Sequence, residues 1–94
     1  MTRPQAVGTL LLEDDRVRVS RFDFAPGAET GWHVHGMDYV ITTLTECVML
    51  LEMDEGNKEV DIAAHTVYGR VAGTKHNVVN RGTAPMAFIE VELK

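Results

Sequence analysis

Residues 31–39 read Gly-Trp-His-Val-His-Gly-Met-Asp-Tyr and contain two histidines one residue apart, His33 and His35. Side chains alternate between the two sides of an extended backbone, so both imidazoles point the same way if this stretch is extended. Neutral imidazole is the commonest protein ligand for transition metals. The pair therefore indicates a candidate metal site, although His-x-His also occurs by chance on exposed strands, where the rings face water.

A third histidine, His76, lies forty-one residues after His35 in a second segment marked by Gly73 and Asn80. If the fold brings the two segments together, three imidazoles converge and leave coordination positions open. Open positions are typical of a catalytic rather than a structural metal site. We therefore predict that His33, His35 and His76 bind one divalent metal ion.

The 94-residue chain is expected to form a single domain over residues 1–94, because it is too short for a second core. Its 45% hydrophobic and 24% charged residues are typical of a folded protein. A net charge of -5 without a cluster of Lys and Arg argues against nucleic acid and anionic membranes as partners. A small molecule is the expected partner.

Cysteine content and the N-terminus bear on the compartment. The single cysteine, Cys47, cannot form an internal disulfide, which argues against a disulfide-stapled secreted scaffold. The first residues lack the apolar core of a signal peptide, and no run approaches the length of a transmembrane helix. A cytoplasmic protein is the expectation.

Helical periodicity is nearly absent from the chain. Short segments rich in Val, Ile, Thr and Phe recur between Gly, Pro, Asn and Asp, which is typical of an all-β sandwich or barrel. The expected strands are Val7–Glu13, Arg16–Phe24, Asp38–Thr45, Cys47–Met53, Glu59–Ile62, Thr66–Val71, Asn77–Asn80 and Met86–Leu93.

The second expected strand has an irregular pattern. Val17 and Val19 have one parity, whereas Phe22 and Phe24 have the other. A regular strand cannot hold both pairs on one face, so we predict a β-bulge near Ser20–Arg21. The alternative is a strand whose two faces are both partly buried.

The last expected strand alternates regularly. Its odd-numbered residues from Ile89 to Leu93 are apolar, and its even-numbered residues from Glu90 to Lys94 are charged. Such alternation predicts that the apolar side is buried and that the charged side faces water.

The His-x-His segment resembles the first of the two motifs of the cupin superfamily. That motif runs Gly, five residues, His-x-His, three or four residues, Glu, six residues and Gly. Here Gly27 precedes His33 by the same interval, and the motif spans about residues 27–47.

The His76 segment resembles the second cupin motif, which runs Gly, five residues, Pro-x-Gly, two residues, His, three residues and Asn. Gly73, His76 and Asn80 fall at matching spacing, within about residues 65–80. The resemblance to the RmlC-like cupin superfamily covers about residues 20–92. It implies an all-β fold, a cupin-type antiparallel β-barrel or jelly roll.

The chain departs from the cupin pattern at several positions. Tyr39 stands in place of the usual Glu, Cys47 and His65 in place of Gly, and Val71 in place of Pro. The resemblance therefore implies a three-His ligand set without a carboxylate. Tyr39 has the parity of the two histidines, so we interpret it as a pocket residue able to donate a hydrogen bond to a substrate carboxylate. Metal ligation and core packing are the alternatives for Tyr39.

Several functions stay open. A divalent transition metal is expected. The residues do not choose among Fe(II), Zn(II), Ni(II) and Mn(II). Some thiol-oxygenating cupins resemble this ligand set, and residues 25–33 resemble short cupins associated with beta-alanine degradation. The first hypothesis is a metal-dependent enzyme acting on a small carboxylate, for example a dioxygenase. The alternatives are a non-catalytic ligand-binding or sensing cupin, with or without metal, and a metal-free, isomerase-like use of His33 or His76 as general base.

Three consecutive leucines, Leu10–Leu12, mark the first expected strand. They suit a strand buried on both faces or covered by another subunit. Small cupins commonly pair through their outer sheets, so the resemblance implies a homodimer. The alternative is a monomer whose first strand folds onto its own barrel.

Overall fold

Residues 2–94, which the computed structural model describes, form nine strands. The strands are β1 (Val7–Glu13), β2 (Val17–Phe24), β3 (His33–Val34), β4 (Tyr39–Thr43), β5 (Cys47–Glu52), β6 (Lys58–Ile62), β7 (Val67–Arg70), β8 (Lys75–Asn80) and β9 (Met86–Leu93). Each of the eight predicted strands is present, with ends that differ by at most two residues. Met1, the first residue of the predicted domain, lies outside the described residues.

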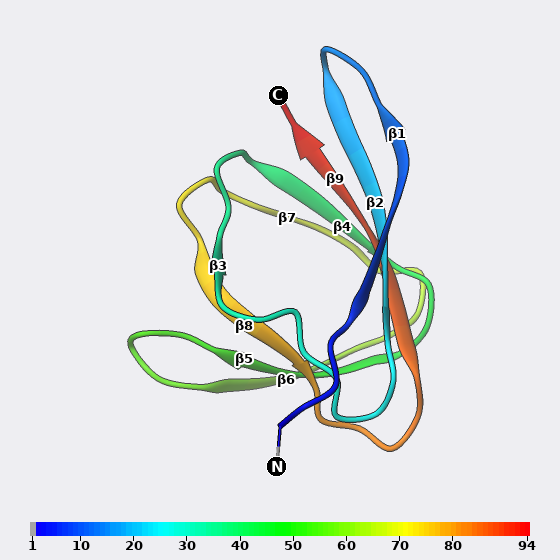
Figure 1. Ribbon diagram of the computed structural model, residues 1–94, viewed down its shortest axis with the longest axis vertical. Helices are drawn as coiled ribbons and strands as arrows, with labels where there is room; N and C mark the ends of the chain where they lie inside the picture. The colour runs from blue at the N-terminus through cyan, green and yellow to red at the C-terminus, as the bar shows by residue number, and fades with distance from the viewer. Residues whose placement is uncertain (1) are drawn as a thin grey trace.

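The strands make two antiparallel sheets that enclose the core (Figure 1). The five-stranded sheet has the order β1-β2-β9-β4-β7, and the four-stranded sheet has the order β3-β8-β5-β6. The predicted all-β fold with antiparallel sheets is thereby confirmed. Residues 2–94 include no helix with the length and hydropathy needed to cross a membrane.

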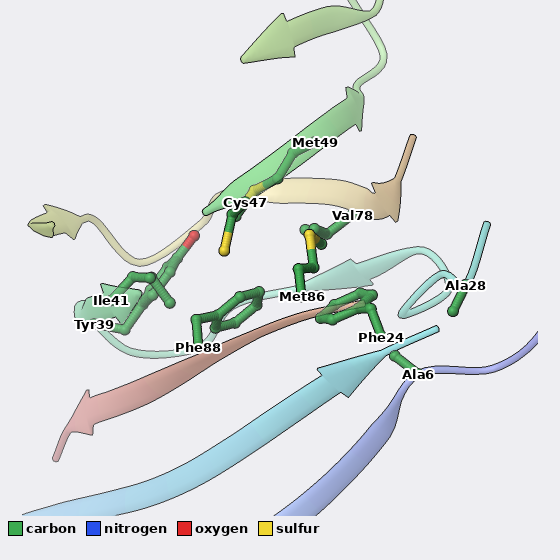
Figure 2. Close-up of a cluster of buried hydrophobic side chains, with 10 residues drawn as sticks. All are labelled: Ala6, Phe24, Ala28, Tyr39, Ile41, Cys47, Met49, Val78, Met86 and Phe88. Atoms are coloured by element: carbon green, nitrogen blue, oxygen red, sulfur yellow. The ribbon is translucent and has the colours of Figure 1, made fainter. Parts of the chain in front are cut away.

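The hydrophobic core lies between the two sheets. Phe24, Met86 and Phe88 project from the five-stranded sheet, and Met49 and Val78 approach them from the four-stranded sheet (Figure 2). The rings of Phe24 and Phe88 pack with their centroids 5.4 Å apart. Each buried side chain of this size contributes about 1.5–3 kcal/mol, so this cluster holds the sheets together.

The register of the five-stranded sheet aligns inward-facing side chains in rows. Glu90 on β9 pairs with Ile41 on β4, and Ile41 pairs with Tyr68 on β7. In the next row, Tyr39 on β4 pairs with Arg70 on β7. Partners in a row point to the same side of a sheet. These rows therefore bring polar side chains from three strands to one inner wall.

The structure contains a β-bulge in β1 instead of β2. β2 pairs with β9 along its whole length, whereas the register between β1 and β2 shifts between Leu10 and Leu12. The bulge predicted near Ser20–Arg21 is therefore wrong. β2 is instead a regular strand whose two faces are both partly buried, because Val19 is half-buried on one face and Phe24 is buried on the other. An extra residue in the edge strand disturbs only one ladder.

Candidate metal centre

Pairing between β3 and β8 brings the two histidine segments side by side. His33 on β3 is the cross-strand partner of His76 on β8. His35 lies just past the end of β3, and the loop between β7 and β8 holds its backbone. The His35 amide donates to the Thr74 carbonyl (2.9 Å), and the Gly73 amide donates to the His35 carbonyl (2.7 Å). The two segments that the sequence separates therefore form one site.

The three imidazoles converge through their Nε2 atoms. The distance from His35 Nε2 is 3.0 Å to His33 Nε2 and 3.2 Å to His76 Nε2. One ring nitrogen from each residue lies within 4.8 Å of the others. Two nitrogens that bind one ion at 2.0–2.1 Å and at an angle of 90–110° are about 2.9–3.4 Å apart. The spacing therefore fits three ligands on one face of a divalent ion.

A hydrogen bond sets the tautomer of one imidazole. His33 Nδ1 lies 2.8 Å from the Gly31 carbonyl oxygen, which only accepts hydrogen bonds. Nδ1 therefore carries the proton, and the lone pair of Nε2 faces the centre. A ligating histidine usually has such an outer partner.

A buried polar network supports the Gly31 segment. Asn77 Oδ1 accepts from the Gly31 amide (2.9 Å), and Asn77 Nδ2 donates to the carboxylates of Glu29 and Glu52 (2.8 Å each). Arg3 pairs with both carboxylates from outside. Sequence reasoning missed Asn77, although its position next to His76 was a usable signal.

Burial keeps two of the histidines neutral. The pKa of His35 and of His76 is lowered to about 4, mainly by desolvation and in smaller part by the neighbouring His33. His76 also lies near the positive charge of Arg70, which acts in the same direction on its pKa. Both rings are therefore in the neutral, ligating form at pH 7.

Tyr39 faces inward, as its parity predicted. Its ring stacks on the His35 ring, with centroids 3.8 Å apart and planes 19° apart. The side chain is only 3% exposed, and among residues 2–94 its hydroxyl has no hydrogen-bond partner. Burial raises the pKa of Tyr39 to about 12, so the phenol keeps its proton. A protonated phenol is a free donor, and this argues against metal ligation by Tyr39.

A carboxylate enters the site from β9. Glu90 is 8% exposed, and its Oε1 lies 3.9 Å from His35 Nδ1. Burial raises the pKa of Glu90 to about 7; Glu92 adds to this shift and Arg18 opposes it. The two predicted faces of this strand are reversed. Glu90, expected to face water, is buried beside Ile41 on the inner wall, whereas Leu93, expected to be buried, is 45% exposed, and Ile89 and Val91 are only half-buried. The alternating sequence of β9 defined two faces of the strand but did not show which face lines the interior of the protein.

A cavity of about 450 Å³ adjoins the three histidines, within the size range of small-molecule sites. Its wall is mostly apolar, and four charged residues reach it: Lys58, Asp61, Arg70 and Glu90. Asp61 forms an ion pair with Arg81. A small ligand in this cavity would lie beside the three imidazoles in apolar surroundings with a few charged groups.

The other motif positions have structural roles. His65 is exposed at a turn with a φ of 62° and lies outside the histidine cluster. Asn80 closes a turn: it accepts from the Gly82 amide (3.0 Å) and donates to the Ala84 carbonyl (2.9 Å). Cys47 is fully buried, and burial raises the pKa of its thiol. The thiol is therefore a poor nucleophile.

Comparisons with known proteins agree with this geometry. The Cupin domain family matches residues 20–92. The chain is 46% identical over 92 residues to the beta-alanine degradation protein BauB of Pseudomonas aeruginosa, covering 98% of this chain and 97% of that protein. A crystal structure of a cupin domain from Bordetella pertussis Tohama I superposes with a TM-score of 0.97, at 40% identity, over 100% of this chain and 98% of that chain. The polyketide cyclase RemF from Streptomyces resistomycificus (TM-score 0.75, 21% identity, 99% of this chain and 70% of that chain) shares the fold alone.

Proposed function

The chain belongs to the Cupin domain family, and from this premise we propose that it is a metal-binding cupin in which His33, His35 and His76 hold one divalent transition metal ion. The observation that carries the proposal is the convergence of the three Nε2 atoms at spacings that fit one ion. Fe(II), Zn(II), Ni(II) and Mn(II) all accept imidazole ligands. A bound ion would supply a Lewis acid with open coordination positions.

We propose that the ligand is a small carboxylate metabolite of beta-alanine degradation and that the reaction is its oxygenation. The name of the Pseudomonas aeruginosa relative, 46% identical over almost the whole of both chains, supports this choice of pathway. A cavity of about 450 Å³ suits a small molecule. The three-His ligand set leaves room for both a substrate and O₂, as a dioxygenase requires.

The chain's own residues would prepare the ligand. Apolar side chains of the cavity wall, including Ile41 and Phe88, would exclude water from it. The Tyr39 hydroxyl would donate a hydrogen bond to it. Glu90 Oε1, close to His35 Nδ1, would take or return a proton, because burial brings the pKa of Glu90 to about 7.

Metal content tests the ligand set. Protein purified without a His-tag or chelator is expected to contain close to one metal per chain by elemental analysis. His76→Ala is expected to lose the metal, whereas His65→Ala, which changes a histidine outside the cluster, is expected to keep it. Full metal content in folded His76→Ala protein would overturn the three-His site.

Oxygen uptake tests the reaction. Fe(II)-loaded protein is mixed with beta-alanine, other β-amino acids, keto acids and small thiol carboxylates in turn. The proposal expects uptake with at least one of them and none with His76→Ala. Tight binding of a member of the panel without uptake would instead support the non-catalytic, ligand-binding alternative.

We also propose that two copies pair through β1. This strand lies at the edge of the five-stranded sheet, and Leu10, Leu11 and Leu12 are 53%, 53% and 54% exposed. An exposed apolar edge strand invites pairing with another chain. A second copy would cover this surface.

A further inference from the structure

Arg70 is a cation in the cavity wall that the proposed metal centre does not use. It ends β7, the edge strand of the five-stranded sheet, and lies two residues after Tyr68, on the same face. Its guanidinium lies over the Tyr68 ring, with Cζ 4.6 Å from the ring centroid, and its Nη1 donates to the Gly69 carbonyl (2.9 Å). Stacking holds a planar guanidinium in place and leaves its edge free for hydrogen bonds.

Arg70 has no acidic partner among residues 2–94. Of the two carboxylates in the cavity wall, Asp61 is paired with Arg81, and Glu90 lies against His35. A guanidinium carries five N–H donors in a fixed plane. Most of the donors of Arg70 are therefore free for a ligand.

A second free donor lies beside Arg70. Tyr39 is its cross-strand partner, so both side chains leave the sheet on the same face from Cα positions about 5 Å apart. The Tyr39 side chain projects from β4 into the space between the sheets (Figure 2) and lines the same cavity. Its hydroxyl is buried and makes no hydrogen bond of normal geometry among the described residues, and the nearby Thr74 hydroxyl only partly offsets the rise in its pKa. A buried hydroxyl in this state is unfavourable, and an acceptor on a ligand would satisfy it.

We propose that Arg70 and the Tyr39 hydroxyl form a carboxylate-binding subsite, which orients the small ligand on which the proposed function depends. A carboxylate has only acceptors, and it matches the planar fork of Arg70 in bidentate geometry while the phenol donates a further hydrogen bond. Because the Tyr39 ring stacks on His35, a carboxylate held there lies beside the three-histidine centre. The ligand class is a short-chain carboxylic acid.

Lys58 provides a control for the role of Arg70 in this subsite. Lys58, the other cation in the cavity wall, begins β6, an edge strand of the four-stranded sheet. Its cross-strand partner is the apolar Leu51, so no second donor lies opposite it. If the cavity bound anions through general attraction alone, Lys58 and Arg70 would contribute alike. A subsite made of Arg70 and Tyr39 predicts a marked difference between them.

The test is an NMR titration of metal-free protein with propionate and with propionamide, its uncharged analogue. Propionate is expected to shift the Arg70 Nε–H resonance and the amide of Tyr39 with saturation, and propionamide is expected to bind at least about ten-fold more weakly. Equal binding of the two probes would overturn the proposal, as would propionate binding that leaves the Arg70 resonance unmoved. Preferential binding of inorganic phosphate would overturn the assignment of a carboxylate.

Variants then locate the effect. Arg70→Gln is expected to weaken propionate binding about ten-fold or more, and Arg70→Lys less, because it keeps the charge and loses the fork. Lys58→Gln is expected to bind like the wild type. Equal affinities of wild type and Arg70→Gln, or an equal loss in Lys58→Gln, would overturn the subsite. The wild-type Arg70 resonance decides the question even if a variant fails to fold.

The two proposals fail separately. Because the titration uses metal-free protein, saturable propionate binding at Arg70 would support the subsite even if elemental analysis found no metal. Conversely, a metal-loaded protein that binds propionate without the help of Arg70 would refute the subsite and leave the metal centre in place.

Discussion

Replacing Asn77 by alanine is expected to destabilise the fold and to weaken metal binding together. Asn77 is 1% exposed and connects Gly31 with the carboxylates of Glu29 and Glu52. The Gly31 carbonyl in turn accepts the hydrogen bond that orients His33. The variant therefore removes the support of one imidazole without touching any of the three histidines.

The magnitude follows from the hydrogen bonds that are lost. A buried amide left without a partner costs about 1–3 kcal/mol, and the half-buried Gly31 amide is expected at the lower end of this range. Each hydrogen bond to a carboxylate contributes about 1.5–3 kcal/mol, and this is reduced here because Glu29 and Glu52 are partly exposed and keep Arg3 as a partner. The free energy of unfolding is expected to fall by about 3–5 kcal/mol. Loss of the outer support of a ligating histidine typically weakens metal affinity by about 10–100-fold.

Urea unfolding of metal-free protein measures the first effect, and competition with a chromophoric chelator measures the second. Asn57→Ala is the matched control, because Asn57 is exposed in the loop between β5 and β6; its effect is expected to stay within about 0.5 kcal/mol. Asn77→Asp would place a buried carboxylate oxygen against the carboxylates of Glu29 and Glu52, so it is expected to destabilise the fold at least as much as Asn77→Ala. If Asn77→Ala were as stable as Asn57→Ala, the network would not support the site.

Three further predictions concern pH, the phenol and the assembly. In the metal-free protein, stability is expected to fall as the pH drops from about 6.5 to about 4, because the unfolded chain protonates His35 and His76 near 6.5 whereas burial lowers their folded pKa to about 4. Glu90, with its pKa raised from 4.5 to about 7, binds its proton more tightly in the folded state and therefore acts in the opposite direction. In urea unfolding at several pH values, the free energy of unfolding of Glu90→Gln should fall more steeply with decreasing pH than that of the wild type. A shallower fall would contradict the raised pKa of Glu90. Tyr39→Phe removes a buried hydroxyl without a partner and is expected to raise the free energy of unfolding by about 1 kcal/mol or more, while weakening propionate binding; a destabilised variant would show that the hydroxyl is already satisfied. Leu11→Glu is expected to convert a dimer to a monomer in sedimentation velocity, and a monomeric wild type would refute pairing through β1.

The strands and the histidine cluster could be predicted from local pattern. Gly, Pro, Asn and Asp interrupt the chain at nearly every point where a strand ends, so eight strands were placed to within two residues. Residue spacing identified His33, His35 and His76 as one group, and the structure brings them together. Parity placed Tyr39 on the inner side. The strands, the His33–His35 pair and the inward side of Tyr39 needed only the alternation of an extended backbone, whereas adding His76 also needed the resemblance to the two cupin motifs.

The remaining residues of the site depended on how the strands pair. Glu90 alternates with apolar residues as a solvent-facing residue would, and only the pairing of β9 with β4 turns it toward His35. Arg70 looks like an ordinary charge at a strand end until the pairing of β7 with β4 places it beside Tyr39. Alternation defines two faces of a strand, but the register and order of the strands in the closed sheets decide which face lines the cavity. The sequence alone therefore determined the strands, the three histidines and the inward Tyr39, whereas the tertiary structure decided which charged groups surround them.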